Sequence, residues 1–249
     1  MLQAARRKAM LITFDIDGTL LKGGENANTG HKRAIEWAVS KVWGVEATVQ
    51  SVKHGGLTDP IIIQNMLRKH GKSDQEIWGK MDQALQMATE YFEKTYADNE
   101  PVTVLPGVHS LLDTLKQRGV YLAVVSGNLE SIGWKKLERA QLRPYFMTGA
   151  FGSDHTSRGE LIRIAKRRVL QCCGVAAADD DVLSWDIYHV GDTLEDMQAA
   201  KDACVLGIGV LTGNVRQVEE FGEAHSSWWP FLVLPDLTHR EVLLARLGI

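Results

Sequence analysis

The segment MLITFDIDGTL, residues 10–20, joins an apolar run to two carboxylates that are one residue apart. The apolar part is rich in residues that favour strands, so it predicts a buried β-strand. Side chains alternate along a strand, and Asp15 and Asp17 therefore point the same way where the strand ends. Two adjacent carboxylates repel each other unless a cation or a shared proton holds them. The pair predicts a magnesium-dependent active site at the carboxyl end of this strand.

A second apolar run, residues 120–125, ends in Ser126 and is followed by Gly127 and Asn128. The run predicts another strand, and the carboxyl ends of parallel strands meet at one rim of a sheet. A hydroxyl at that rim can donate a hydrogen bond to a phosphoryl oxygen. A plain Ser-Gly-Asn turn is the alternative interpretation, because all three residue types favour turns.

A third run, residues 185–191, is followed by Asp192 and then by Asp196, at the start of a helical pattern. Asp192 adds a carboxylate to the same rim, where it can share a cation with the first pair. Two interpretations of Asp196 stay open. It is either an acid that supports the metal site or a first-turn acid that interacts with the helix dipole.

Together these segments resemble the first, second and fourth motifs of the haloacid dehalogenase-like hydrolases, most of which are phosphatases, along nearly the whole chain. The resemblance implies that Asp15 attacks phosphorus to form an aspartyl-phosphate, and that Asp17 acts first as general acid and then as base. It implies a Mg²⁺ ion held by Asp15, the backbone carbonyl of Asp17 and Asp192, with Asp196 as the second acid of the fourth motif. Ser126 would bind a phosphoryl oxygen.

The third motif departs from the family pattern, in which a Lys usually precedes the helix before the fourth motif. At the corresponding position this chain carries Arg158, just before a helix predicted over 160–172. Arginine is always charged and can bind carboxylate or phosphate in a bidentate way, so it can fill the role. Lys166 is the competing candidate, but it lies about 12 Å further along that helix.

The segment between the first and second motifs reads as a block of helices. Apolar residues recur at helical spacing over 31–42, after Pro60 and over 74–96, and only 49–52 suggests a strand. A helical insertion at this place resembles the C1-type cap of the family, which implies a small-molecule substrate because such a cap closes over the site. The expected division is a core of 1–24 and 103–249 with a cap of 25–102.

Within the expected cap, the segment GGLTDP, residues 55–60, resembles the substrate loop of members like phosphoglycolate phosphatase. The resemblance implies that Thr58 binds substrate, together with Gly127 and Asn128 of the second motif. The alternative is that Thr58 or Asp59 simply caps a helix that Pro60 opens.

From residue 106 onward, predicted helices and strands alternate regularly, including a strand over 121–126, a helix over 214–225 and a terminal helix over 240–247. Such alternation is typical of an α/β protein with a parallel sheet covered by helices on both faces. The predicted fold is therefore a Rossmann-like, doubly wound parallel sheet with a small inserted α-helical cap domain.

Composition limits the partners and the location. The 249 residues carry a formal net charge of −3, which gives no electrostatic case for binding nucleic acid or an anionic membrane. No apolar run approaches the roughly 18 residues that a membrane span needs. The three cysteines have neither metal-ligand nor clear disulfide spacing, so a reducing cytoplasmic location is the simplest expectation. The expected partner is a small phosphorylated metabolite, bound by a monomer or homodimer.

The predicted function is a Mg²⁺-dependent phosphatase that hydrolyses a small phosphate monoester, either phosphoglycolate-like or a sugar phosphate. A phosphosugar mutase of the β-phosphoglucomutase type is the nearest alternative, because it shares the acid at Asp17 and the cap. A 2-haloacid dehalogenase is disfavoured, because dehalogenases of this family usually lack an acid at that place. A non-catalytic metabolite sensor is disfavoured for a related reason: it has no use for the acid.

Overall fold

The computed structural model describes residues 8–23, 28–99, 101–175, 185–221 and 230–249. Its strands are β1 (Met10–Phe14), β2 (Tyr121–Ser126), β3 (Thr148–Phe151), β4 (Asp186–Gly191), β5 (Leu206–Val210) and β6 (Leu232–Leu234). Its helices are α1 (Thr29–Trp43), α2 (Asp59–Lys69), α3 (Asp74–Trp78), α4 (Met81–Thr95), α5 (Val108–Gln117), α6 (Glu130–Arg139), α7 (Arg158–Cys172), α8 (Leu194–Asp202) and α9 (Arg240–Leu247).

The strands form one parallel sheet in the order β3-β2-β1-β4-β5-β6. The chain builds outward from β1 to β3 and then returns to the other side of β1 with β4. This reversal creates a crevice beyond the carboxyl ends of β1 and β4, which is where ligands bind in sheets of this kind. The α/β, Rossmann-like fold predicted from the sequence is confirmed.

Alternation along the buried strands gives the sheet two apolar faces. On one face Ile12 and Phe14 pack with residues of α5, α6 and α9. On the other face Leu11 packs with residues of α7 and α8, such as Leu161 and Ala199. Both faces are thus covered by helices, so the strand ends are the part of the sheet left for chemistry.

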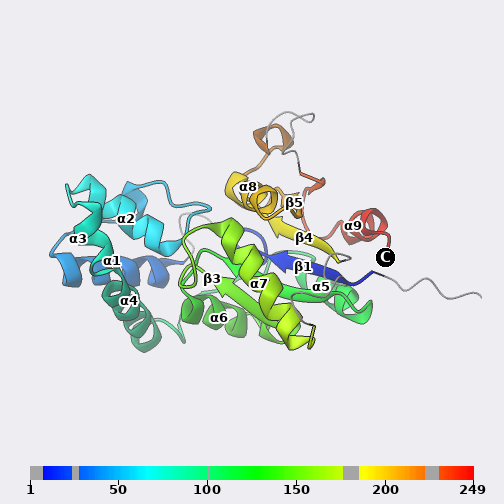
Figure 1. Ribbon diagram of the computed structural model, residues 1–249, viewed down its shortest axis with the longest axis horizontal. Helices are drawn as coiled ribbons and strands as arrows, with labels where there is room; N and C mark the ends of the chain where they lie inside the picture. The colour runs from blue at the N-terminus through cyan, green and yellow to red at the C-terminus, as the bar shows by residue number, and fades with distance from the viewer. Residues whose placement is uncertain (1–7, 24–27, 100, 176–184, 222–229) are drawn as a thin grey trace, which may run out of the picture.

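Helices α1 to α4 group together beside the sheet (Figure 1). They share their own apolar cluster, in which Ile35 of α1 packs with Ile63 and Met66 of α2. A second cluster joins α1 and α4 to Leu129 and Ile132, which lie at the start of α6. The assignment of this helical block to a separate cap domain of 25–102 stays a prediction, and residues 25–27 at its edge lie outside the described part of the chain.

Three local predictions were wrong. The helix expected over 74–96 is two helices, because α3 ends at Gly79, a residue that weakens a helix interior. The possible strand at 49–52 is a single 3₁₀ turn, Val49–Ser51. In place of a helix expected over 214–225 the described part shows only the 3₁₀ turn Val218–Phe221, while 222–225 lie outside it.

Within the described ranges, no helix is both long enough and apolar enough to cross a bilayer.

Candidate active site

Asp15 and Asp192 follow the two strands that flank the reversal in strand order. The backbone N–H of Asp15 donates to the Val190 carbonyl at 2.9 Å, which fixes the relative height of the two strand ends. Oxygen atoms of Asp15, Asp192 and Asp196 all lie within 4.8 Å of one another, and all three residues are buried. The structure therefore brings together the acids predicted from two separate motifs.

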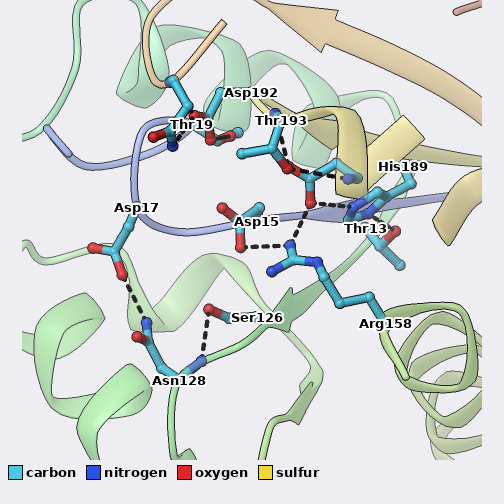
Figure 2. A network of polar contacts seen from close by, with 12 residues as sticks. Thr13, Asp15, Asp17, Thr19, Ser126, Asn128, Arg158, His189, Asp192 and Thr193 are labelled. Carbon is cyan, nitrogen blue, oxygen red and sulfur yellow. Dashed lines mark hydrogen bonds and ion pairs between the residues drawn. The ribbon is translucent and has the colours of Figure 1, made fainter. Parts of the chain in front are cut away.

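Asp192 is held by groups from two loops. Thr19 Oγ1 donates to its Oδ1 at 3.2 Å, while the backbone N and Nδ2 of Asn214 donate to its Oδ2 at 2.7 and 3.1 Å (Figure 2). Gly18 has a φ of +96°, and a Cβ built there would lie 2.5 Å from the same oxygen. The turn after β1 thus needs glycine both for its backbone conformation and for the close approach of Asp192.

Burial and mutual repulsion raise the pKa of two of these acids. Burial raises the pKa of Asp15 well above its usual range, against the effect of Arg158, and the neighbouring acids raise it further. Burial together with the charge of Asp196 raises the pKa of Asp192 to about 6, against its bonds from Asn214 and Thr19. A bound cation would relieve this concentration of negative charge. The donors are hard carboxylate oxygens, the type that Mg²⁺ prefers.

Arg158 begins helix α7, and its guanidinium reaches back to the acids. Its Nη2 donates to Asp15 Oδ1 at 3.0 Å and also pairs with Asp196 Oδ1 (Figure 2). Lys166, the competing third-motif candidate, lies two turns further along α7 and does not line the cavity described below. The geometry therefore favours Arg158 as the cation of the third motif.

Asp196 has both carboxylate oxygens engaged by the protein. Its Oδ2 accepts from the backbone N of Thr193 at 3.0 Å and from Thr193 Oγ1 at 2.6 Å, in a capping box at the start of α8. Its Oδ1 meets Arg158 and, at 3.2 Å, Nε2 of His189. Burial would raise the pKa of Asp196, but Arg158 and His189 outweigh it and hold the pKa far below its usual range. These contacts fit a supporting acid, and direct metal contact by Asp196 stays a prediction.

Asp17 is turned away from Asp15 and toward Asn128 (Figure 2), so the expectation that the two side chains point the same way is wrong: β1 ends at Phe14, before both acids. Asn28 Nδ2 donates to its Oδ1 at 2.9 Å, while Asn128 Nδ2 and Lys136 Nζ donate to its Oδ2 at 2.9 and 2.8 Å. Burial alone would raise the pKa of Asp17, but Lys136 and Asn128 outweigh it and lower the pKa. In this arrangement Asp17 is held as a carboxylate.

Lys136 was not predicted as a site residue, although the sequence contains a signal for it. In α6 it falls on the buried face with Ile132, Gly133 and Leu137. A lysine on the apolar stripe of a helix is unusual unless it has a partner. His189 and Asn214 were missed as well. The first is a polar residue inside an otherwise apolar strand, while the second carries no pattern that points to Asp192.

The predicted substrate-binding residues line two different cavities. Ser126, Gly127 and Asn128 line the main cavity at the end of β2. Thr58 is buried, donates its hydroxyl to the Thr156 carbonyl at 3.2 Å, and lines a smaller neighbouring cavity. Thr58 occupies the N-cap position of α2, as the capping alternative predicted, but its side chain makes no capping bond there, and its contact with substrate stays a prediction.

Asp59, the other candidate cap, ties the helical block to the sheet. Its Oδ2 lies 2.8 Å from Nε2 of His31 and accepts from the backbone N of Leu129 at 2.8 Å. Its own N–H donates to the Gly127 carbonyl at 2.9 Å. The start of α2 is therefore bonded directly to the loop that follows the second motif.

The acids open into a cavity of about 420 Å³ between the sheet and the helical block. From the strand ends it is lined by Asp15, Asp17, Ser126, Asn128 and Arg158. From the helical block come two lysines, two histidines and an aliphatic wall: Lys32, Lys53, His31, His54, Ile35, Val49, Val52, Leu57 and Ile62. The volume suits a small organic ligand.

Comparison with curated proteins gives phosphoglycolate phosphatases of several bacteria. The one from Pseudomonas putida is 27% identical over 229 residues, which cover 91% of this chain and 76% of the relative. The one from Escherichia coli is 22% identical over 257 residues, which cover 96% of this chain and 92% of the relative. The predicted resemblance to phosphoglycolate phosphatase is confirmed.

Solved structures share the fold along nearly the whole chain. CbbY from Rhodobacter sphaeroides in complex with phosphate has a TM-score of 0.65 at 21% identity, with 97% of this chain and 99% of that chain covered. A predicted phosphoglycolate phosphatase from Haemophilus somnus has a TM-score of 0.60 at 19% identity, with 96% and 99% covered. At these identities the likeness concerns the fold.

The family model that describes the haloacid dehalogenase-like hydrolases matches residues 9–203 of this chain. This span includes every motif predicted from the sequence. With the curated relatives, this match confirms the prediction of an enzyme, a phosphomonoester hydrolase. The chain belongs to the haloacid dehalogenase-like hydrolase family.

Proposed function

We propose that the protein is a Mg²⁺-dependent phosphatase that hydrolyses a small phosphate monoester through an aspartyl-phosphate on Asp15. One observation carries the proposal. The carboxylate of Asp15 lies beside a cation, Arg158, and a second acid, Asp192, at the base of a cavity that also receives Asp17 and Ser126. These are a nucleophile, a charge-neutralising group and an acid-base residue in one place.

Asp15, Asp192 and the backbone carbonyl of Asp17 would hold the metal ion, with Asp196 behind them. When bound, Mg²⁺ would neutralise charge on the phosphoryl group and orient it. The raised pKa values of Asp15 and Asp192 support this assignment, because both carboxylates gain from a nearby positive charge.

In the first half-reaction Asp15 forms a bond to phosphorus while the ester P–O bond breaks. Asp17 supplies a proton to the departing oxygen, so that an alcohol leaves. Arg158 keeps the nucleophile oriented and Ser126 donates to a phosphoryl oxygen. Asp17 must be protonated for this step, which means that its bonds to Lys136 and Asn128 weaken when substrate binds.

In the second half-reaction a water molecule attacks the aspartyl-phosphate, and Asp17 takes its proton. The arrangement described above suits this step directly, because Asp17 is held as a carboxylate. Phosphate leaves, Asp15 is regenerated, and the proton on Asp17 is available for the next turnover.

For the substrate we propose a short phosphate monoester with an anionic end, like phosphoglycolate, the substrate named for the relatives. The lysines Lys32 and Lys53 line the cavity from the helical block, where a carboxylate of the leaving group would lie. No phenylalanine, tyrosine or tryptophan of the described residues lines the cavity, and an aromatic face of that kind is a common platform for a sugar ring. A sugar phosphate is the second candidate.

The test is release of inorganic phosphate from a panel of esters by the purified protein. The panel pairs phosphoglycolate with glycerol phosphate and glucose 1-phosphate, with Mg²⁺ or with EDTA, for the wild type and Asp15→Asn. Asp82→Asn, on an exposed position of α4, is the matched control. We expect Mg²⁺-dependent turnover that Asp15→Asn abolishes and Asp82→Asn preserves. Equal phosphate release by wild type and Asp15→Asn would overturn the proposal, and conversion of glucose 1-phosphate to an isomer without phosphate release would identify a mutase.

A cytoplasmic location and a monomeric or homodimeric state stay predictions.

A further inference from the structure

Behind Arg158 the structure places three polar groups in line, none of which the proposed reaction uses directly. They are Asp196 in α8, His189 in β4 and Thr13 in β1, and each has an exposed fraction of 0%. His189 Nε2 lies 3.2 Å from Asp196 Oδ1, and His189 Nδ1 lies 2.9 Å from Thr13 Oγ1 (Figure 2). Buried polar groups of this kind need complete hydrogen bonding, so their arrangement is specific.

The proton positions follow from the partners. An ionised carboxylate only accepts, so the N–H of the ring faces Asp196 and lies on Nε2. Nδ1 then has a free lone pair, so the single hydroxyl proton of Thr13 points to Nδ1, at 2.9 Å, rather than to the alternative acceptor, the Tyr188 carbonyl at 3.1 Å. Burial lowers the pKa of His189, which agrees with a ring that carries one N–H.

The two residues of this line that lie farthest from Arg158 are on rigid strands of the sheet. Thr13 and His189 are directly paired in the register of β1 with β4, at the centre of the sheet. Their side chains point to the face that α7 and α8 cover, where Arg158 and Asp196 lie in the first turns of those helices. A functional group supported from neighbouring strands is held more precisely than one supported from a loop.

Arg158 depends on this support because it has few other anchors. Its Nη2 serves both Asp15 Oδ1 and Asp196 Oδ1, while its Nε is buried and has no hydrogen-bond partner among the described residues. The direction of the guanidinium is therefore set through Asp196. If the carboxylate of Asp196 turned, Arg158 would turn with it and Asp15 would lose its partner.

We propose that His189 is a positioning residue: its Nε2–H fixes the carboxylate of Asp196, and through it the contact of Arg158 with the nucleophile Asp15. This inference rests on the proposed function of Asp15. Thr193 anchors the other oxygen of Asp196, so His189 and Thr193 together prevent its rotation. His189 itself does not line the substrate cavity.

The test compares His189→Leu, which removes the donor, with His189→Gln, whose amide N–H can replace Nε2–H. Ile187→Ala is the matched control, because Ile187 lies two residues earlier on the same face of β4 and packs in the apolar cluster of that face. We expect kcat per folded molecule to fall about 10–100-fold in His189→Leu, as is usual when a supporting hydrogen bond is lost. KM should change less, since the interaction matters most in the transition state.

His189→Gln should recover most of kcat, and Ile187→Ala should lose stability while keeping kcat. A ¹⁵N NMR spectrum of the His189 ring, recorded without substrate or metal, should show the proton on Nε2. A kcat in His189→Leu equal to that of wild type, or a proton on Nδ1, would overturn the inference while leaving the proposed function intact. If Asp15→Asn itself remains fully active, the proposed function fails first.

Discussion

Lys136 Nζ lies 2.8 Å from Asp17 Oδ2, although the lysine comes from the interior of α6 and the acid from the turn after β1. The lysine side chain has an exposed fraction of 0%, and the same Nζ lies 3.3 Å from Asn128 Oδ1. It also approaches His31 Nδ1 at 3.4 Å, and His31 in turn meets Asp59. The acid-base candidate is thus connected through one buried cation to the first two helices of the helical block.

Removal of this cation by Lys136→Met should leave Asp17 with amide donors alone. Breaking a buried ion pair on one side typically costs about 3–5 kcal/mol of unfolding free energy. We expect Lys136→Met to lower the unfolding free energy by about 3 kcal/mol or less, because Asn28 and Asn128 still donate to Asp17. Urea unfolding of the variant would measure this loss of unfolding free energy.

The control is Lys135→Met, the adjacent change on the partly exposed side of α6, which should cost less than about 1 kcal/mol. Equal losses in both variants would show that the Lys136–Asp17 contact is unimportant.

Asp17→Asn should affect substrates according to their leaving groups. A nitrophenolate leaves without a proton, whereas an alkoxide needs one, so the lost proton donor matters most for alkyl esters. We expect kcat for an alkyl phosphate to fall about 10²–10⁴-fold, the usual contribution of general acid-base catalysis. The first step with p-nitrophenyl phosphate, followed as the burst of nitrophenol in stopped flow, should fall much less. A burst reduced as strongly as alkyl ester turnover would argue against Asp17 as the proton donor.

The raised pKa of Asp192, about 6, makes the stability of the metal-free protein depend on pH. An acid with a higher pKa in the folded state stabilises the fold below its unfolded pKa near 3.9, and this contribution is lost as pH rises through the folded pKa. The unfolding free energy of the wild type relative to Asp192→Asn should therefore decrease from about pH 4 to pH 6, by at most about 1.4 kcal/mol per unit. Burial lowers the pKa of His189, so this residue makes stability rise with pH in both proteins. The difference between wild type and Asp192→Asn cancels most of that contribution.

Chemical unfolding in EDTA at several pH values would measure that difference. Saturating Mg²⁺ should stabilise the wild type more at pH 7 than at pH 5, because metal binding requires deprotonated carboxylates. A relative stability that rises with pH in EDTA would contradict the assignment of Asp192 as a buried, proton-binding acid.

Three of the predicted site residues share one property: each lies where a buried strand ends. Asp15, Ser126 and Asp192 could be placed together because parallel strands point their carboxyl ends to one rim. The supporting residues Lys136, His189 and Asn214 were missed because their roles depend on which side chains meet across the fold. For the same reason, no sequence pattern indicated that Thr58 bonds the Thr156 carbonyl.

The helices and strands could be predicted for a related reason, because burial leaves a pattern in the sequence. Strands buried on both faces and amphipathic helices leave strong periodic patterns, and β2 and α9 begin and end where those patterns predicted. The break between α3 and α4 was missed because the apolar spacing continues across it, while Gly79 and Lys80 end one helix and start the next. Periodicity records which face is buried but does not mark a local interruption of the backbone.

Gly18→Ala should damage the metal site through sterics. Gly18 has a φ of +96° and a Cβ there would meet the Asp192 carboxylate at 2.5 Å, whereas Gly44 has a φ of +66° with nothing within 4 Å. Both substitutions carry the cost of a left-handed alanine, about 1–2 kcal/mol, and only Gly18→Ala also displaces Asp192. We expect Gly44→Ala to keep its Mg²⁺ affinity and Gly18→Ala to lose it at least about 10-fold, as when a group that orients a ligand is disturbed. Isothermal titration with Mg²⁺ would compare the two. Equal affinities would show that Asp192 moves away without consequence, and hence that it does not hold the ion.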